Sequence, residues 1–163
     1  MGAIEKSAIT YGIVFGVLLI VYGFFYRVAG LERLPGFTAP FYLALPLCAY
    51  LTVRALPSPE NPLTFRGATV PGVIASVLAA GIYCIFVFFY NAYVDDSLLQ
   101  QLVQNSVAAW QAQDVPQSTI DEQLTSFSFT PAGFALTIFI LMSLASIVGG
   151  LIVGWIVVRK QDG

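Results

Sequence analysis

Long apolar stretches alternate with short charged segments along the chain, and four of these stretches contain no charged residue. An apolar helix needs about 20 residues to cross a hydrocarbon core of about 30 Å, and each stretch is long enough to do so. Transmembrane strands take about 9–11 residues of alternating polarity, a pattern that these stretches lack. We therefore predict four transmembrane helices, at about residues 7–27, 37–54, 68–94 and 132–158.

The second predicted span differs from the others because it is rich in proline. Pro35 and Pro40 stand at its start, and Pro46 lies inside it. Proline removes one helical N–H, and neighbouring helices in a membrane can compensate for this loss. We expect the spanning part to begin near Phe37 and the helix to bend near Pro46.

Basic residues are distributed unevenly between the two ends of the predicted helices. Cytoplasmic flanks of membrane proteins carry an excess of Lys and Arg. With the N-terminus in the cytoplasm, the cytoplasmic side holds Lys6, Arg54, Arg66, Arg159 and Lys160. The opposite side then holds only Arg27 and Arg33, and the segment 95–130 has neither Lys nor Arg. We expect both termini to be cytoplasmic and the segment 95–130 to lie outside.

Small residues recur at every fourth position in three of the predicted spans. Helices in lipid gain little from burying apolar surface, and they associate where small side chains let their backbones approach. The residues with this spacing are Ala8, Gly12, Gly16, Gly72, Ser76, Ala80, Ser146, Gly150 and Gly154. We predict that they pack helix against helix in a compact bundle, either within one chain or between copies of it.

The segment 95–130, between the third and fourth spans, has the pattern of a small helical hairpin. In its first half, apolar residues recur at helical spacing opposite a glutamine-rich face, at Leu99, Val103, Val107 and Trp110. In its second half, Thr119 and Glu122 have the spacing of a capping box, which predicts that Thr119 caps a short second helix. The apolar face either contacts a partner, with Trp110 as an anchor, or rests on the bundle or the lipid headgroups.

The composition narrows the class of protein further. Hydrophobic residues make up 58% and charged residues 10% of the 163 positions, whereas an average soluble domain has about 25% charged residues. There are too few charges to coat a soluble fold, which excludes a cytosolic enzyme and a secreted domain. With no His and a net charge of −2, the chain also lacks the basic surface that binding to nucleic acid requires.

The interiors of the predicted spans contain no Asp, Glu, Lys, Arg or His. Proton relays and ion coupling depend on such side chains within the membrane. Cys48 and Cys84 are expected to differ in depth by about 18 Å, too far for a disulfide or a metal pair. No base stands near Ser76, Ser143 or Ser146 to activate a hydroxyl. We therefore expect no catalytic, cofactor-binding or metal-binding residue, and no enzymatic activity.

Several short motifs stand in an order that is similar to one family. Ile9–Gly12 opens the first span, Leu63–Ala68 leads into the third, Phe88–Tyr93 ends it, and Arg159–Lys160 ends the fourth. With these motifs in this order, the chain resembles a family of small bacterial membrane proteins that is known only as a domain of unknown function, the DUF 4199 type. The resemblance covers nearly the whole chain. It implies a four-span membrane fold and a location in a bacterial cell inner (plasma) membrane. It implies no activity, since none is established for the family.

The sequence therefore predicts an all-α integral membrane protein, a four-helix transmembrane bundle with a small extracytoplasmic helical hairpin between the third and fourth spans. We expect a structural or accessory subunit that packs in the lipid bilayer against other membrane protein subunits or copies of itself. The alternative is a small permease or channel for an uncharged or lipid-like solute. The apolar and aromatic residues in the outer half of the predicted spans and Pro46 favour this alternative. An intramembrane enzyme would have to use a loop carboxylate such as Asp95.

Overall fold

The computed structural model describes residues 3–31, 38–56 and 63–160, which form helices and connecting turns without strands. The predicted all-α class is confirmed for this part of the chain. Contacts divide the chain into two units, which we describe separately. Unit 1 comprises Met1–Tyr83 and Ile140–Gly163, and unit 2 comprises Cys84–Phe139.

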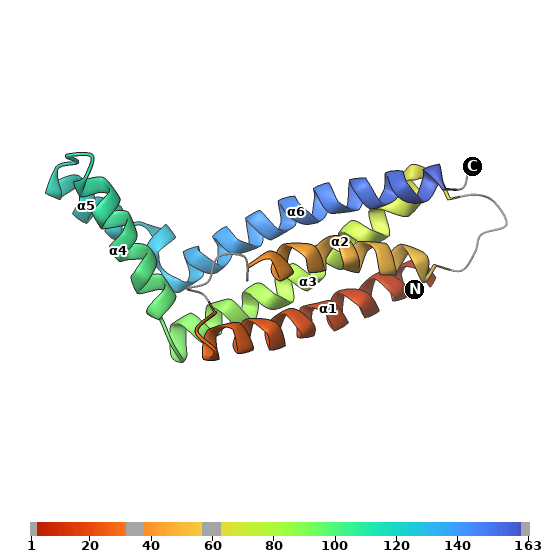
Figure 1. The fold of residues 1–163 in the computed structure, drawn as a ribbon, viewed down its shortest axis with the longest axis horizontal. Coiled ribbons are helices and arrows are strands. Elements are labelled where there is room, and N and C mark those ends of the chain that lie inside the picture. Colours follow the sequence, from red (N-terminus) through yellow and green to blue (C-terminus); the bar gives the residue numbers. More distant parts are fainter. Residues whose placement is uncertain (1–2, 32–37, 57–62, 161–163) are drawn as a thin grey trace. The chain divides into compact units, whose positions relative to one another are not determined.

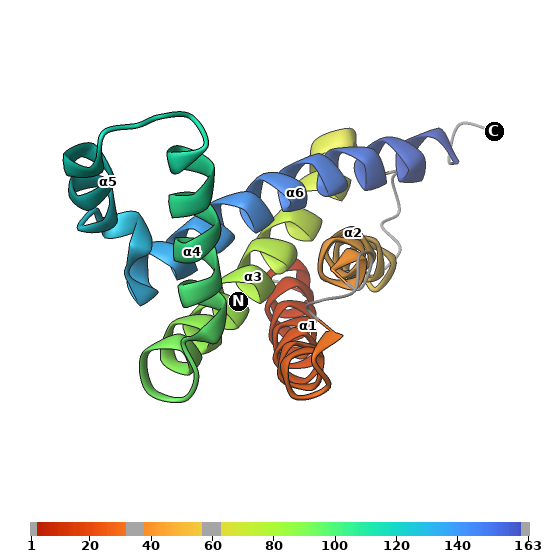
Figure 2. The same cartoon turned by 60° about the vertical axis from the view of Figure 1, so that its left-hand side comes forward.

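Unit 1 is a bundle of four helical segments (Figure 1). They are α1 (Ala3–Val28), α2 (Ala39–Arg54), α3 (Phe65–Tyr93) as far as Tyr83, and α6 (Pro131–Arg159) from Ile140 onward. Figure 2 views α2 nearly end-on, with α1, α3 and α6 around it. The shortest helix of the bundle contacts all three long ones, through Ser7 of α1, Ser76 of α3 and Gly149 of α6.

Three of these helices are long and apolar enough to cross a membrane. They are Glu5–Val28 within α1, Phe65–Tyr93 and Pro131–Arg159, with 24, 29 and 29 residues. The helix at the position of the second predicted span, α2, has only 16 residues. At 1.5 Å per residue it is about 24 Å long, less than a hydrocarbon core of about 30 Å.

The helix α2 begins at Ala39 and tolerates two prolines. Pro40 lies in its first turn, where the missing N–H has no helical partner in any case, and the helix continues through Pro46. The predicted bend at Pro46 stays a prediction. The predicted start at Phe37, like Pro35 and Arg33, lies outside the residues that the structure describes.

The centre of unit 1 is filled with small and medium-sized side chains. Those without any exposed surface include Leu45, Cys48, Ala49, Thr52, Ala68, Ala75 and Ser76. The faces that point away from the bundle carry large apolar side chains instead, such as Val21 of α1, which is 61% exposed, and Leu144 of α6, which is 56% exposed. This distribution suits a bundle surrounded by hydrocarbon.

Unit 2 contains a pair of short helices between the ends of α3 and α6. These helices are α4 (Ser97–Gln111) and α5 (Gln117–Leu124), followed by a single 3₁₀ turn, η2 (Phe127–Phe129). Asp114 lies in the turn between them with a φ of 54°, a conformation that Asp tolerates better than most residues. Two helices therefore lie within the segment 95–130, as the sequence predicts.

The start of the second short helix differs from the prediction. Thr119 does not cap it, because α5 begins two residues earlier and Pro116 occupies the cap position. The Pro116 carbonyl accepts the N–H groups of Thr119 and Ile120 at 3.0 and 3.1 Å, which places Thr119 inside the first turn. The predicted capping box is therefore wrong, and proline, with its fixed φ, sets the helix start.

Candidate functional site

The small residues of α1 face α3 of the same chain. A β-carbon added to Gly12 would lie 2.9 Å from the Ala75 carbonyl oxygen, and one added to Gly16 would lie 2.8 Å from the Ile82 β-carbon. Ala8, one turn earlier on α1, is 2% exposed. The absence of side chains at these positions lets the two helices approach closely.

The small residues of α6 also lie against α3. A β-carbon at Gly150 would collide with the side chain of Val73, and one at Gly154 would collide with the hydroxyl of Thr69. Ser146 is fully buried and donates a hydrogen bond to the Met142 carbonyl at 2.8 Å. The stripe on α6 is therefore used for packing inside unit 1.

The third stripe joins α3 to α2. A β-carbon at Gly72 would lie 3.0 Å from that of Ala49, and Ala80 is fully buried. The hydroxyl of Ser76 donates to the Leu45 carbonyl of α2 at 2.8 Å and lies 2.9 Å from the carbonyl of Gly72. Every pair of helices described so far meets through small residues of one chain.

One glycine of α1 that packs closely against α3 does not follow the four-residue spacing, and the sequence pattern did not predict it. Gly23 lies seven residues after Gly16, and a β-carbon there would lie 2.8 Å from the ring of Tyr83. Two helical turns separate the two glycines, so they lie on the same face of α1. A spacing of seven residues between glycines, in addition to the spacing of four, therefore identifies Gly23 as a packing position.

The predicted partner-contact residues of α4 point largely into unit 2. Leu99 is 8% exposed, while Val103, Val107 and Trp110 are half-buried. The Trp110 ring meets the ring of Phe129 edge to face, with centroids 5.8 Å apart. The opposite, glutamine-rich face of α4 is exposed, as is Leu102 at 38%.

The polar and nucleophilic side chains serve packing rather than forming a cluster. Cys48 and Cys84 are free and buried, and the thiol of Cys48 lies 3.8 Å from the Tyr11 carbonyl oxygen that it faces. The Asp95 carboxylate accepts the N–H of Ser97 at the start of α4, at 2.9 Å. In the part of the chain that the structure describes, no three Cys, Asp or Glu side chains gather in a way that could hold a metal ion.

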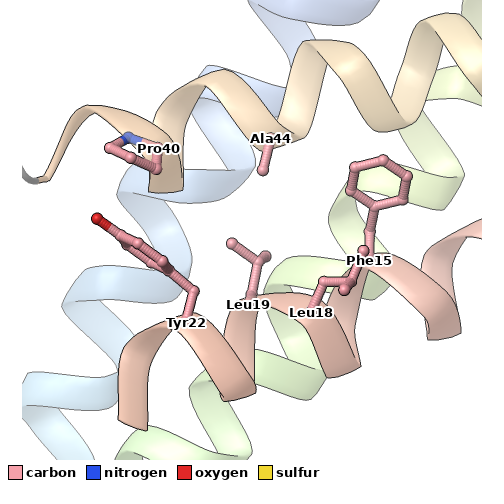
Figure 3. A pocket seen from close by; sticks show the side chains of 6 residues that line it. All are labelled: Phe15, Leu18, Leu19, Tyr22, Pro40 and Ala44. Carbon is pink, nitrogen blue, oxygen red and sulfur yellow. The ribbon is translucent and has the colours of Figure 1, made fainter. Parts of the chain in front are cut away.

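A pocket of about 260 Å³ lies between α1 and α2 (Figure 3). It is lined by Phe15, Leu18, Leu19 and Tyr22 of α1 and by Pro40 and Ala44 of α2. Leu19 and Ala44 face each other across the pocket, and Tyr22 reaches toward Pro40 at one end. The lining is apolar except for the tyrosine hydroxyl, so the pocket offers no charge to a ligand.

Tyr22 of the pocket lining also belongs to an aromatic cluster. The ring of Phe41 on α2 lies between rings of α1 and α3, with centroids 4.9 Å from Tyr22, 5.6 Å from Tyr26 and 5.2 Å from Tyr83. Aromatic pairs at such distances contribute about 0.5–1.5 kcal/mol each beyond their buried area. The cluster therefore fixes α1, α2 and α3 relative to one another beside the pocket.

Comparison with known families decides the assignment of the chain. The model of one family, described as a protein of unknown function (DUF4199), matches residues 10–159. The chain belongs to the DUF4199 family. This finding confirms the resemblance inferred from the sequence motifs. No curated protein and no solved structure matches this DUF4199 chain.

Proposed function

We propose that this DUF4199 protein is a multi-pass integral membrane protein that acts as a structural or accessory subunit and has no catalytic chemistry. The observation that carries this proposal is the contrast between the inside and outside of unit 1. Leu45, Cys48 and Ser76 fill the centre without exposed surface, while large apolar side chains cover the outward faces. Such a bundle can contact lipid or other membrane proteins through its outward faces, and its filled centre favours this role over catalysis inside the bundle.

The proposed topology has four crossings, with both termini in the cytoplasm of a bacterium's inner membrane. In Figure 1 the start of α1, the end of α2, the start of α3 and the end of α6 lie at the same end of unit 1. Lys6, Arg54, Arg66 and Arg159 belong to these helix ends, which supports a cytoplasmic location for this end of unit 1, because cytoplasmic flanks carry an excess of basic residues. The segment 95–130 then forms an extracytoplasmic hairpin.

The short helix α2 is the fourth crossing in this proposal. It is held by all three long helices: Ser7 donates to the Thr52 carbonyl at 3.3 Å, Ser76 donates to Leu45, and Gly149 lies against Pro46. A short span is accommodated when the bilayer thins locally or flanking residues extend to the interface. Arg54, at the end of α2, is exposed and suited to such an extension.

The outward face of α6 is the surface proposed to meet another subunit. Only 28% of the residues in the most apolar stretch of α6 are buried, compared with 44% for α3. Leu144, Val148, Leu151 and Trp155 are exposed along this face at spacings of three and four residues. Side chains at this spacing form one stripe, which a neighbouring membrane helix can contact along its length.

Site-specific photo-crosslinking in native membranes tests this role. A photoreactive residue at Leu144 or Val148 should give crosslinks to a discrete protein, whether another subunit or a second copy. The matched control is the same photoreactive residue at Val21, which is 61% exposed on α1 and should crosslink only to lipid. A chain that gives no protein crosslink from α6 and always purifies alone and monomeric in mild detergent contradicts the proposal.

The pocket between α1 and α2 favours a second candidate, a permease for an uncharged or lipid-like solute. The pocket lies on the flank of the bundle, however, while the fully buried side chains of Leu45 and Ser76 occupy the centre. Flux of such solutes into vesicles that contain the purified protein would favour this candidate. Vesicles that remain tight to a broad panel of solutes would remove it.

A further inference from the structure

Most of the basic residues stand at one end of unit 1, where α1 and α3 begin and α2 and α6 end (Figure 1). Three of these helix ends share one apolar cluster, to which α2 contributes Val53, α3 contributes Ala68 and α6 contributes Val153. The start of α1 joins them through Ser7, whose hydroxyl donates to the Thr52 carbonyl at 3.3 Å. The four helix ends are therefore packed against one another.

The basic side chains at this end are exposed and unpaired. We call them the basic rim, and they are Lys6, Arg54, Arg66, Arg159 and Lys160. Arg54 directly follows Val53 of the apolar cluster, and Arg66 stands two residues, or about 3 Å, before Ala68. Within the part of the chain that the structure describes, none of the rim residues forms an ion pair. Glu5 is the one carboxylate among the described residues of this end.

Trp155 marks the depth at which the basic rim lies. The Arg159 guanidinium lies over the Trp155 ring, 5.1 Å from its centroid, and this tryptophan is 56% exposed. Leu151, one turn earlier on α6, is 44% exposed and apolar. Tryptophan is enriched where the hydrocarbon meets the lipid headgroups. The rim therefore stands at headgroup depth when the bundle crosses the membrane as proposed above.

We propose that the basic rim binds the headgroups of anionic phospholipids in preference to those of zwitterionic ones. Clusters of about four to eight Lys and Arg beside a membrane helix attract anionic lipids, and guanidinium groups bind phosphate oxygens with charge-assisted hydrogen bonds. An excess of basic residues also orients a chain in the membrane. Selectivity between headgroups needs, in addition, cations that stay exposed and free of ion pairs in the folded protein, as the rim residues do. The inference rests on the membrane crossings proposed above.

An acidic segment of a soluble protein is a poorer partner for the rim than a phospholipid. Exposed apolar rings stand next to its cations: Phe65 precedes Arg66 and is 45% exposed, and Trp155 lies under Arg159. An acidic segment satisfies the charges but leaves these rings uncovered. A phospholipid covers both, because its phosphate meets the cation and its acyl chains meet the apolar surface.

The test measures which lipid touches Trp155, in the full-length protein. The chain has two tryptophans, so Trp110→Phe leaves Trp155 as the reporter beside Arg159. The protein is placed in vesicles of equal parts phosphatidylglycerol and phosphatidylcholine, and one of the two lipids carries bromine atoms, which quench tryptophan fluorescence on contact. From the contribution of one basic residue near the surface, phosphatidylglycerol is expected to contact Trp155 about fivefold more often than phosphatidylcholine.

Two variants of Arg159 separate charge from structure. Arg159→Gln should bring the contacts of the two lipids to within about twofold of each other. Arg159→Lys keeps the charge and should keep most of the preference for phosphatidylglycerol. Added salt should weaken the preference in the unaltered rim, because the cations are exposed.

A second reporter at the other end of α3 is the matched control. In a chain with both native tryptophans replaced by Phe, Phe89→Trp places the reporter at a 54% exposed position. The acidic residues Asp95 and Asp96 follow the end of α3. This reporter should therefore show no preference for phosphatidylglycerol.

Three outcomes would overturn the proposal. They are equal quenching by the two lipids at Trp155, an unchanged preference in Arg159→Gln, and the same preference at the Phe89 reporter as at Trp155. In each of them, quenching by either lipid still shows that the helices lie in the bilayer. A protein in which neither lipid quenches the reporters would instead refute the crossings themselves.

Discussion

The bundle of unit 1 and the α4–α5 pair of unit 2 are built with opposite distributions of large and polar side chains. In the bundle, the fully buried positions include Ala49, Ala75 and Ser76, and the exposed positions are large and apolar. In the α4–α5 pair, the buried positions are the large residues Leu99 and Ile120, and glutamines are exposed. One chain thus contains two kinds of helix packing.

This difference reflects the solvent that surrounds each region. In lipid, apolar burial gives no net driving force between helices, so close backbone approach and hydrogen bonds hold them together. In water, burial of large apolar side chains is the main driving force, and polar residues cover the outside. We infer that lipid surrounds the bundle and water surrounds α4 and α5, and the following substitutions test this difference.

The largest effect is expected for Gly12→Leu in the bundle. The new β-carbon would lie 2.9 Å from the Ala75 carbonyl oxygen and 2.8 Å from the Leu78 side chain, so α1 must move away from α3. We expect a loss of about 3 kcal/mol in the free energy of unfolding, the upper end for an overpacked core. Unfolding by a denaturing detergent measures it. Val17→Leu, at a 50% exposed position of α1, should be neutral, and an equal loss in both variants would contradict close approach as the cause.

Replacing an exposed leucine by lysine should show whether that position faces lipid or water. Leu144 lies in the middle of α6 and is 56% exposed, and Leu102 of α4 is 38% exposed. Leu144→Lys should cost about 3 kcal/mol of membrane insertion, as measured by a glycosylation-based insertion assay. Leu102→Lys should change stability by less than about 0.5 kcal/mol, as for other surface substitutions in water. Similar costs for the two lysines would remove the distinction between the regions.

Truncation of a large core residue should affect only the α4–α5 pair. Ile120 of α5 is 1% exposed, and Ile120→Ala should destabilise the pair by about 2 kcal/mol, the low end for a buried Ile in a region that can collapse. Hydrogen exchange measures the loss as faster exchange of the amides in α4 and α5. Gln104→Ala on the exposed face is the control. Faster exchange in α1 or α2 as well would show that the bundle depends on this pair.

Periodicity predicts most of the helices and much of the packing in unit 1. Gly12, Gly72 and Gly150 could be found from a spacing of four because one face of a helix recurs at that spacing. The length of α2 could not be found in this way. The helix starts at Ala39, next to Pro40, where backbone hydrogen bonding begins. The charge-free stretch from which the span was predicted is longer and covers residues 34–53.

The aromatic contact within unit 2 and the pocket between α1 and α2 could not be predicted from local patterns. Trp110 and Phe129 are in contact although a turn and the helix α5 separate them in the sequence. The start of α5 depends on Pro116 rather than on Thr119. Tyr22, which lines the pocket, packs against Phe41 of α2, and Phe41 also packs against Tyr83 of α3. Such distances follow from the packing of all the helices together, which no single stretch of sequence specifies.

The smallest effect is expected for Ser76→Ala, which separates hydrogen bonding from close packing in the bundle. The Ser76 hydroxyl lies 2.8 Å from the Leu45 carbonyl oxygen of α2, and the side chain is fully buried. Alanine keeps the small volume and removes only the donor, so we expect a loss of about 0.6 kcal/mol, the average for hydrogen bonds between membrane helices. Unfolding in a denaturing detergent measures it, with the exposed Ser118→Ala of α5 as the matched control. A loss several times larger would mean that hydrogen bonds, rather than the absence of large side chains, hold α2 against α3, and the contrast between the two regions would then need a different explanation.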